Sequence, residues 1–214
     1  MHHMPTLLQI VNFFGLGYDP KGLAEVSGIL TVVALLIVIV VGLVIDLLEH
    51  VEMKILGKIF GRNFAVNFNN YITFPGLFMH ETAHALMALV TGAKITEYHL
   101  FDRGGDSLGH VSYRNRGPRI LQAVQDCATA CAPVLAGLVL GYFTLRAIFV
   151  LGYPLWADIL LWYLFLSILT HASMSGADLK IYFKAVWVLA IPVFCVFFFL
   201  CSRAAGQPVL FFLQ

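Results

Sequence analysis

Two histidines and a glutamate in one apolar segment are the residues of this chain whose types and spacing could do chemistry. Residues 80–84 read HETAH within the stretch 71–91, YITFPGLFMHETAHALMALVT, in which Glu81 carries the one charge. A helix places residues four apart on the same face, so His80 and His84 project together with Glu81 beside them. In this HExxH arrangement two imidazoles hold zinc and the glutamate handles the proton of a water molecule. The alternative is a metal-free polar cluster, which would leave the buried carboxylate poorly compensated.

A catalytic zinc needs a third protein ligand and an open position for water, so a further side chain must come from elsewhere in the chain. Asp178 is the best candidate, in the polar interruption HASMSGADLK between two apolar segments. Two expected membrane crossings separate Thr91 from His171, so both ends fall on one side of the membrane. His171 is the rival ligand: it lies seven residues before Asp178, so one of the two can bind the metal while the other orients it or binds substrate.

The composition places these residues in a membrane. The chain is 60% hydrophobic and 12% charged, with a mean hydropathy of +0.85. A soluble domain carries about 25% charged residues. The long apolar runs therefore predict an integral membrane protein, with the lipid bilayer as its environment. A net charge of +1 gives no basis for a nucleic-acid partner, and the four cysteines lack the spacing of a disulfide framework.

The elements that must position the site are mostly helices. We expect an all-α polytopic membrane protein of five or six transmembrane helices, with a small membrane-associated β-hairpin after the helix that carries HETAH. The clearest span is 27–48, at least as long as the roughly 20 residues that a bilayer core requires. The other expected elements are an amphipathic helix and loop over 49–70, a helix over 71–91, a hairpin over 93–116, and helices over 120–151, 155–170 and 184–201. They form a single domain, 1–214, with an interfacial N-terminal segment over 1–26.

Lysine and arginine are distributed unevenly over the expected loops, which favours a cytoplasmic N-terminus. In that orientation the cytoplasmic side holds Lys21, Lys94, Arg103, Arg114, Arg116, Arg119, Lys180 and Lys184, and the other side holds Lys54, Lys58, Arg62, Arg146 and Arg203. The C-terminal end of the HETAH helix and Asp178 then both lie nearer the cytoplasm.

The order of these motifs resembles a known family. FMHETAHALMALVTGAKIT looks like the zinc helix of the site-2 protease-type intramembrane metalloproteases, in their compact bacterial branch. GGDSLGHVSY stands where that family has a Gly-rich strand, Ala132-Pro133 matches its Gly/Ala-Pro step, and Asp178-Leu179 matches its ligand aspartate. The resemblance covers residues 70–185, the expected catalytic core. One departure is that the Asn-Pro…Leu-Asp-Gly motif is replaced by Ser-Gly-Ala-Asp-Leu.

The resemblance implies an intramembrane zinc metalloprotease in the bacterial inner (cell) membrane, which cleaves transmembrane protein substrates. It implies one zinc per chain, held by His80, His84 and Asp178, with Glu81 as the catalytic residue. An edge strand in the region 104–113 would pair with the extended substrate; the alternative is a purely structural hairpin. The missing Asn-Pro step leaves open which side chain would steady the reacting carbonyl, and the candidates are Ser173, Ser175, His171 and His110.

Two other classes of protein fit the sequence less well. A di-iron membrane oxidase needs clustered histidine boxes, whereas the eight histidines here are scattered. A catalytically inactive membrane scaffold that binds transmembrane helices would be indicated by the loss of Glu81 or of the third ligand, and this chain has both. The sequence leaves the substrate and the oligomeric state open.

Overall fold

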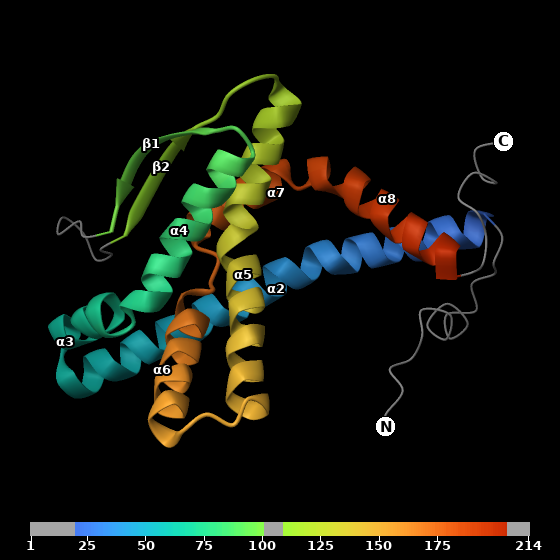
Figure 1. Cartoon of the computed structure of the whole chain (residues 1–214). Coiled ribbons are helices and arrows are strands. Elements are labelled where there is room, and N and C mark those ends of the chain that lie inside the picture. Colours follow the sequence, from blue (N-terminus) through green and yellow to red (C-terminus); the bar gives the residue numbers. More distant parts are fainter. Residues whose placement is uncertain (1–19, 101–108, 205–214) are drawn as a thin grey trace. The chain divides into compact units, whose positions relative to one another are not determined.

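The computed structural model describes residues 20–100 and 109–204, and their contacts divide the chain at Ile37/Val38 and Ala185/Val186 into two compact units. The elements shown in Figure 1 are α2 (Pro20–Phe60), α3 (Arg62–Asn67), a π-helical segment η1 (Phe68–Ile72), α4 (Phe74–Val90), β1 (Lys94–His99), β2 (His110–Arg114), α5 (Arg119–Val150), α6 (Leu155–His171), α7 (Gly176–Ala185) and α8 (Trp187–Ala204). The predicted mostly helical fold with a small hairpin after α4 is confirmed. Most of the predicted interfacial segment, 1–19, lies outside the described residues.

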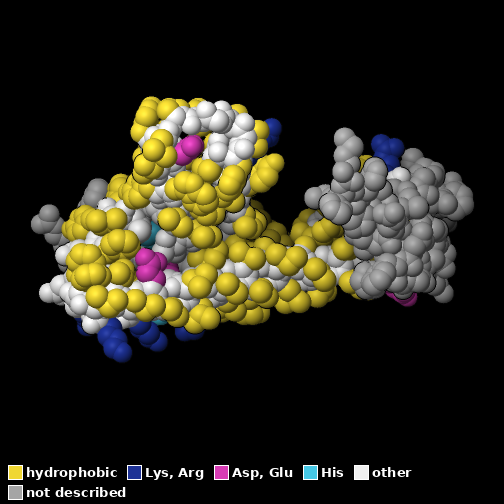
Figure 2. Space-filling model, turned by 90° about the horizontal axis from the view of Figure 1, so that it is seen from below, with side chains coloured by type: hydrophobic (Ala, Val, Ile, Leu, Met, Phe, Trp, Pro, Cys, Tyr) yellow, Lys and Arg dark blue, Asp and Glu magenta, His cyan; other side chains and the backbone are white. Residues whose placement is uncertain are grey.

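Two of the described helices are long and apolar enough to cross a membrane. They are α2 and α5, and α6 with α7 would add a third span if this pair, bent by 62°, is counted as one. Hydrophobic side chains cover most of the described surface in Figure 2, as expected for a chain that faces lipid. The predicted five or six crossings are not confirmed. Helix α4 has 17 residues, about 25 Å, which is shorter than a bilayer core of about 30 Å.

Helix α2 does not end where its hydrophobic run ends. The sequence predicts a span over 27–48 followed by a separate amphipathic helix, but α2 continues to Phe60. Charged residues after position 48 mark a change of environment, yet glutamate and lysine are good helix formers and no proline interrupts them. The helix stops at Gly61, whose φ of 92° lies outside the helical region. The predicted break was therefore wrong, because a hydropathy boundary is not a helix boundary.

The smaller unit is built from the N-terminal part of α2 and from α8. Leu23, Val26 and Cys201 form its buried core. The hydroxyl of Ser27 donates to the Leu23 carbonyl oxygen at 2.7 Å, so this buried polar group is satisfied inside its own helix. The predicted span over 184–201 is not one helix, since α7 ends at Ala185 and α8 begins at Trp187.

The larger unit holds α4, α5 and α6 close together. Figure 1 shows α4 and α5 side by side, with α6 returning along α5. Small residues permit this approach: a Cβ on Gly76 would collide with the carbonyl oxygen of Ser167, and one on Gly137 with the Cβ of Ala172. Its core contains Ile45, Met79 and Ala172, and their packing fixes α4 against the end of α6.

A buried glutamine of α5, Gln125, binds both the end of α4 and the hairpin that follows it. Strands β1 and β2 are antiparallel, with His99 opposite His110 and a bulge between Ile95 and Glu97. The Gln125 side chain donates to the carbonyl oxygens of Thr91 (3.1 Å) and Arg116 (3.2 Å), and accepts the Arg116 N–H at 2.9 Å. These bonds hold the end of α4 and the end of β2 on the same stretch of α5.

Candidate metal centre

The two histidines of HETAH lie together on α4, as their spacing predicts. Their rings are 4.8 Å apart at an angle of 77°, and the two Nε2 atoms are 3.2 Å apart. His84 is buried, with 9% of its surface exposed, and His80 is half-buried. Two of the three expected ligands therefore lie one helical turn apart on the same helix, as the local sequence predicts.

Asp178, the predicted third ligand, is brought to these histidines by the start of α7. Its Oδ2 lies 3.7 Å from Nε2 of His84, and one ligand atom from each of His80, His84 and Asp178 lies within 4.8 Å of the others. Ser175 holds the carboxylate, because its N–H (3.1 Å) and its hydroxyl (2.6 Å) both donate to Oδ2. The Asp178 N–H donates in turn to Ser175 Oγ at 3.1 Å, which makes a capping box at the first turn of α7.

His171, the rival ligand, takes a different place. Its Nε2 lies 2.8 Å from the hydroxyl of Thr73, and its side chain is not among the three that converge. The backbone carbonyl oxygen of His171 instead accepts a hydrogen bond from Nδ1 of His80 at 2.7 Å. His171 therefore supports a candidate ligand through its main chain, while its imidazole binds the start of α4.

Hydrogen bonds from the outer ring nitrogens fix the tautomers of both histidines. Nδ1 of His84 lies 2.9 Å from the carbonyl oxygen of Thr129, and Nδ1 of His80 contacts the carbonyl oxygen of His171. A carbonyl oxygen can only accept, so each Nδ1 carries the hydrogen and each Nε2 presents a lone pair. Two lone pairs then face each other across 3.2 Å.

This arrangement fits a bound zinc ion. Zinc–nitrogen bonds of about 2.05 Å with tetrahedral angles separate two ligand nitrogens by about 3.3 Å, close to the 3.2 Å between the two Nε2 atoms. A cation between them would turn the repulsion of two lone pairs into two bonds. Two imidazoles and a carboxylate are a donor set typical of catalytic zinc. Imidazoles held by backbone carbonyls are also typical of metal sites.

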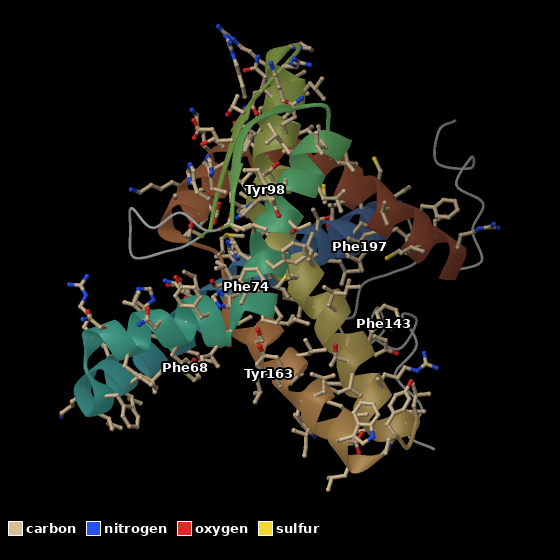
Figure 3. All side chains as sticks on the ribbon, turned by 60° about the vertical axis from the view of Figure 1, so that its left-hand side comes forward. Phe68, Phe74, Tyr98, Phe143, Tyr163 and Phe197 are labelled. Atoms are coloured by element: carbon tan, nitrogen blue, oxygen red, sulfur yellow. The ribbon has the colours of Figure 1, made fainter. Side chains whose placement is uncertain are left out.

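A cavity of about 610 Å³ opens beside the cluster, with the carboxylate of Glu81 in its wall. Glu81 is 8% exposed. Gly109, just before β2, presses against it: a Cβ on Gly109 would lie 2.5 to 2.8 Å from Cγ, Cδ and Oε1 of Glu81. His110, Val111 and Tyr113 of β2 also line the cavity, and no residue of β1 does. Strand β2 is therefore the strand that faces the site. Figure 3 shows Tyr98 of β1 beside α4, where its hydroxyl is 3.0 Å from that of Thr82.

Tyr113 anchors this wall of the cavity to α5. Its hydroxyl donates to Oδ1 of Asp126 at 3.3 Å, and Asn115 donates to the same oxygen at 2.6 Å. Burial, with the nearby Asp126 carboxylate, raises the pKa of Tyr113 above its ordinary value. The phenol therefore stays protonated, and remains a hydrogen-bond donor, throughout the neutral pH range.

Two cavity residues were missed at the level of sequence. Glu49 of α2 accepts hydrogen bonds from Asn69 Nδ2 (3.1 Å) and from the hydroxyl of Ser173 (3.2 Å), and all three line the cavity. The sequence placed Glu49 and Asn69 in the amphipathic helix and loop over 49–70, and only the return of η1 alongside α2 joins them. Among the side chains considered for steadying a carbonyl, His110, His171, Ser173 and Ser175 all line this cavity.

The role of the Thr129 carbonyl as the partner of His84 was also missed, because every residue has a backbone carbonyl and the residue type does not reveal which one is used. The one available signal was Pro133, four residues further along α5.

Comparisons of the chain with protein-family models, with curated proteins and with solved structures find no match to any of them.

Proposed function

We propose that this chain is an intramembrane zinc metalloprotease that hydrolyses peptide bonds in or near transmembrane segments of membrane proteins. The observation that carries the proposal is the convergence of His80, His84 and Asp178, with ligand atoms within 4.8 Å of one another, in the wall of the cavity that also holds Glu81. Zinc in such a site acts as a Lewis acid toward water and toward the scissile carbonyl.

Glu81 is the proposed general base. Its carboxylate reaches the cavity from the same helix as the two histidines, so it can accept a proton from the attacking water and pass it to the leaving amine nitrogen. Gly109 confines it on one side, which limits the positions that the carboxylate can take. Proton transfer by a fixed group of this kind contributes about 10²- to 10⁴-fold to a rate.

Strand β2 is the proposed docking edge for the substrate; residues 104–108 of the expected edge strand, 104–113, lie outside the described residues. A transmembrane helix hides its carbonyls in its own hydrogen bonds, so a segment of it must unwind before it can be cleaved. Within the described residues the sheet has two strands, β1 and β2, and β2 is the one whose residues line the cavity. An extended segment added to an edge of β2 would have its backbone hydrogen-bonded along the cavity wall.

The proposed protein crosses the inner membrane of a bacterium five or six times. What supports several crossings is the presence of two helices able to span, or three with the bent pair α6–α7. The distribution of lysine and arginine favours a site nearer the cytoplasmic side.

The test is Glu81→Gln, a substitution that keeps the side-chain volume and removes the basic carboxylate. The full chain is co-reconstituted in lipid nanodiscs with single-span bacterial membrane proteins, and cleavage is followed by mass spectrometry together with zinc content. We expect cleavage to fall by at least about 10²-fold while zinc stays near one per chain. Glu97→Gln, on the exposed face of β1, is the matched control and should cleave normally.

Normal cleavage by Glu81→Gln would contradict the assigned role of Glu81. A wild-type chain that holds no zinc would contradict the metal centre. Zinc binding by a wild-type chain that cleaves none of the proteins would instead favour a scaffold that binds transmembrane helices.

A further inference from the structure

The carbonyl oxygen that orients His84 lies in the middle of a helix, where a carbonyl normally has a helical partner. It belongs to Thr129, a residue of α5 that is 1% exposed. In an α-helix the oxygen of residue 129 accepts the N–H of residue 133. Residue 133 is Pro133, which has no N–H. The Thr129 carbonyl is thus buried without its helical donor, and Nδ1 of His84 supplies a hydrogen at 2.9 Å.

The corresponding carbonyl for His80 is free for a different reason. It belongs to His171, the last residue of α6, and the final carbonyls of a helix have no helical N–H to accept. Helix α5 does not end near Thr129, since it continues to Val150. In the middle of α5 the proline removes the N–H donor of residue 133, so the Thr129 carbonyl is released without ending the helix.

We propose that Pro133 is a positioning residue of the metal centre, which reserves the Thr129 carbonyl for His84 and so fixes the ring of this ligand. The inference rests on the proposed zinc site. With Nδ1 committed to Thr129, the lone pair of Nε2 points toward His80 and Asp178.

Proline acts on this carbonyl in two ways. It removes the competing N–H, and its ring crowds the carbonyl of the residue four positions earlier, which turns that oxygen away from the helix axis. With alanine at position 133, the oxygen would be drawn back into the helical ladder and shared between two donors. The His84 ring would then lose part of its orientation, although no ligand had been changed.

A purely structural proline makes a different prediction. If Pro133 served only to bend α5 for packing, replacing it would change the stability of the metal-free protein and the affinity for zinc together. Under the proposed role the two change in different directions. Alanine restores a helical hydrogen bond and favours the helix, so the metal-free protein is not destabilised, while the affinity for zinc falls.

The experiment compares wild type with Pro133→Ala in the full chain, using zinc alone as the probe. Zinc affinity is measured by competition with a chromophoric chelator, and thermal unfolding is measured on the metal-free protein. We expect zinc to bind about 10- to 100-fold more weakly, the usual cost of losing an outer partner of a metal ligand. We also expect the metal-free protein to unfold at the same temperature or higher. In ¹⁵N spectra of the metal-free protein, His84 should lose its uniform Nδ1–H tautomer.

Two further variants test whether the effect depends on the position of the proline. Pro192→Ala removes the proline inside α8, outside the unit that holds the site, and should leave zinc affinity unchanged. The double variant Ala132→Pro/Pro133→Ala keeps a proline in α5 but releases the carbonyl of residue 128 instead of Thr129, so it should bind zinc as weakly as Pro133→Ala.

The proposal is overturned if Pro133→Ala binds zinc with wild-type affinity, or if the double variant recovers that affinity. It is overturned as well if metal-free Pro133→Ala unfolds at a lower temperature than wild type, since Pro133 would then serve folding. Failure of the wild-type protein to bind zinc would overturn the metal centre itself, an outcome distinct from the others.

Discussion

At the scale of single residues, the structure gives Asp178 and His171 different tasks. Both lie in the polar interruption after α6, and their spacing alone allowed either to be the third ligand. The Asp178 carboxylate faces His84, whereas the His171 imidazole faces Thr73 and only its carbonyl serves His80. The difference comes from the capping box, because Ser175 precedes α7 and its hydrogen bonds hold Asp178 facing the histidines.

Asp178→Asn and His171→Ala should therefore have opposite outcomes. Asparagine retains an oxygen for the capping box but loses the charge that a metal requires, so zinc affinity should fall by more than the roughly 100-fold cost of losing an outer partner. His171→Ala leaves its backbone carbonyl in place and should keep zinc at about one per chain. Chelator competition measures both, and zinc loss confined to His171→Ala would reverse the assignment of the third ligand.

At the scale of elements, the start of β2 acts as a wall against the proposed base. Gly109 lies so close to Glu81 that no side chain fits between them. Gln125 holds the other end of β2 to α5. A strand so placed can present a substrate to the site and at the same time limit the movement of the carboxylate. The proposed role of the hairpin therefore depends on the absence of a side chain at Gly109.

Gly109→Ala tests this contact. The added Cβ must displace the Glu81 carboxylate, and a displacement of about 1 Å can cost about 10²-fold in rate. We expect cleavage to fall by that order while zinc content is unchanged, because the three candidate ligands are not touched. Gly28→Ala, where an added Cβ meets nothing within 4 Å, is the control. Unimpaired cleavage by Gly109→Ala would show that Glu81 does not need this wall.

At the scale of the whole molecule, α5 lies wholly within the larger unit and is long and apolar enough to cross a membrane. Its 32 residues extend about 48 Å, more than the roughly 30 Å of a bilayer core. The hairpin precedes its first residue, and the turn into α6 follows its last. The two ends should therefore lie on opposite sides of the membrane.

Single cysteines in a background without Cys127, Cys131, Cys195 and Cys201 test this arrangement. Arg119→Cys and Tyr153→Cys, at exposed positions near the two ends of α5, should react with a membrane-impermeant thiol reagent in vesicles of opposite orientation. Lys94→Cys, on the hairpin, should react together with Arg119→Cys. Reaction of Arg119→Cys and Tyr153→Cys from one side would exclude α5 as a membrane span.

Local sequence predicted much of this molecule. The strands β1 and β2 lie within the expected hairpin range, 93–116. Helix α5 differs from its expected range by one residue at each end, and α6 by one residue at its C-terminal end. The expected helix over 71–91 ends within one residue of Val90, the last residue of α4, and Gly92 follows with a φ of 87°. The end of α2 was missed because charged residues change the environment of a helix without breaking it.

The sequence by itself determined the apolar character of the chain and the pairing of His80 with His84, because hydrophobic runs and helical periodicity are local properties. Only the tertiary structure decided what surrounds that pair. The separation of Asp178 from His171, the carbonyl of Thr129 and the cavity residues Glu49 and Asn69 all depend on which helix ends meet. Which helix ends lie together is set by close packing at small residues such as Gly76. A single sequence does not show which residue packs against which.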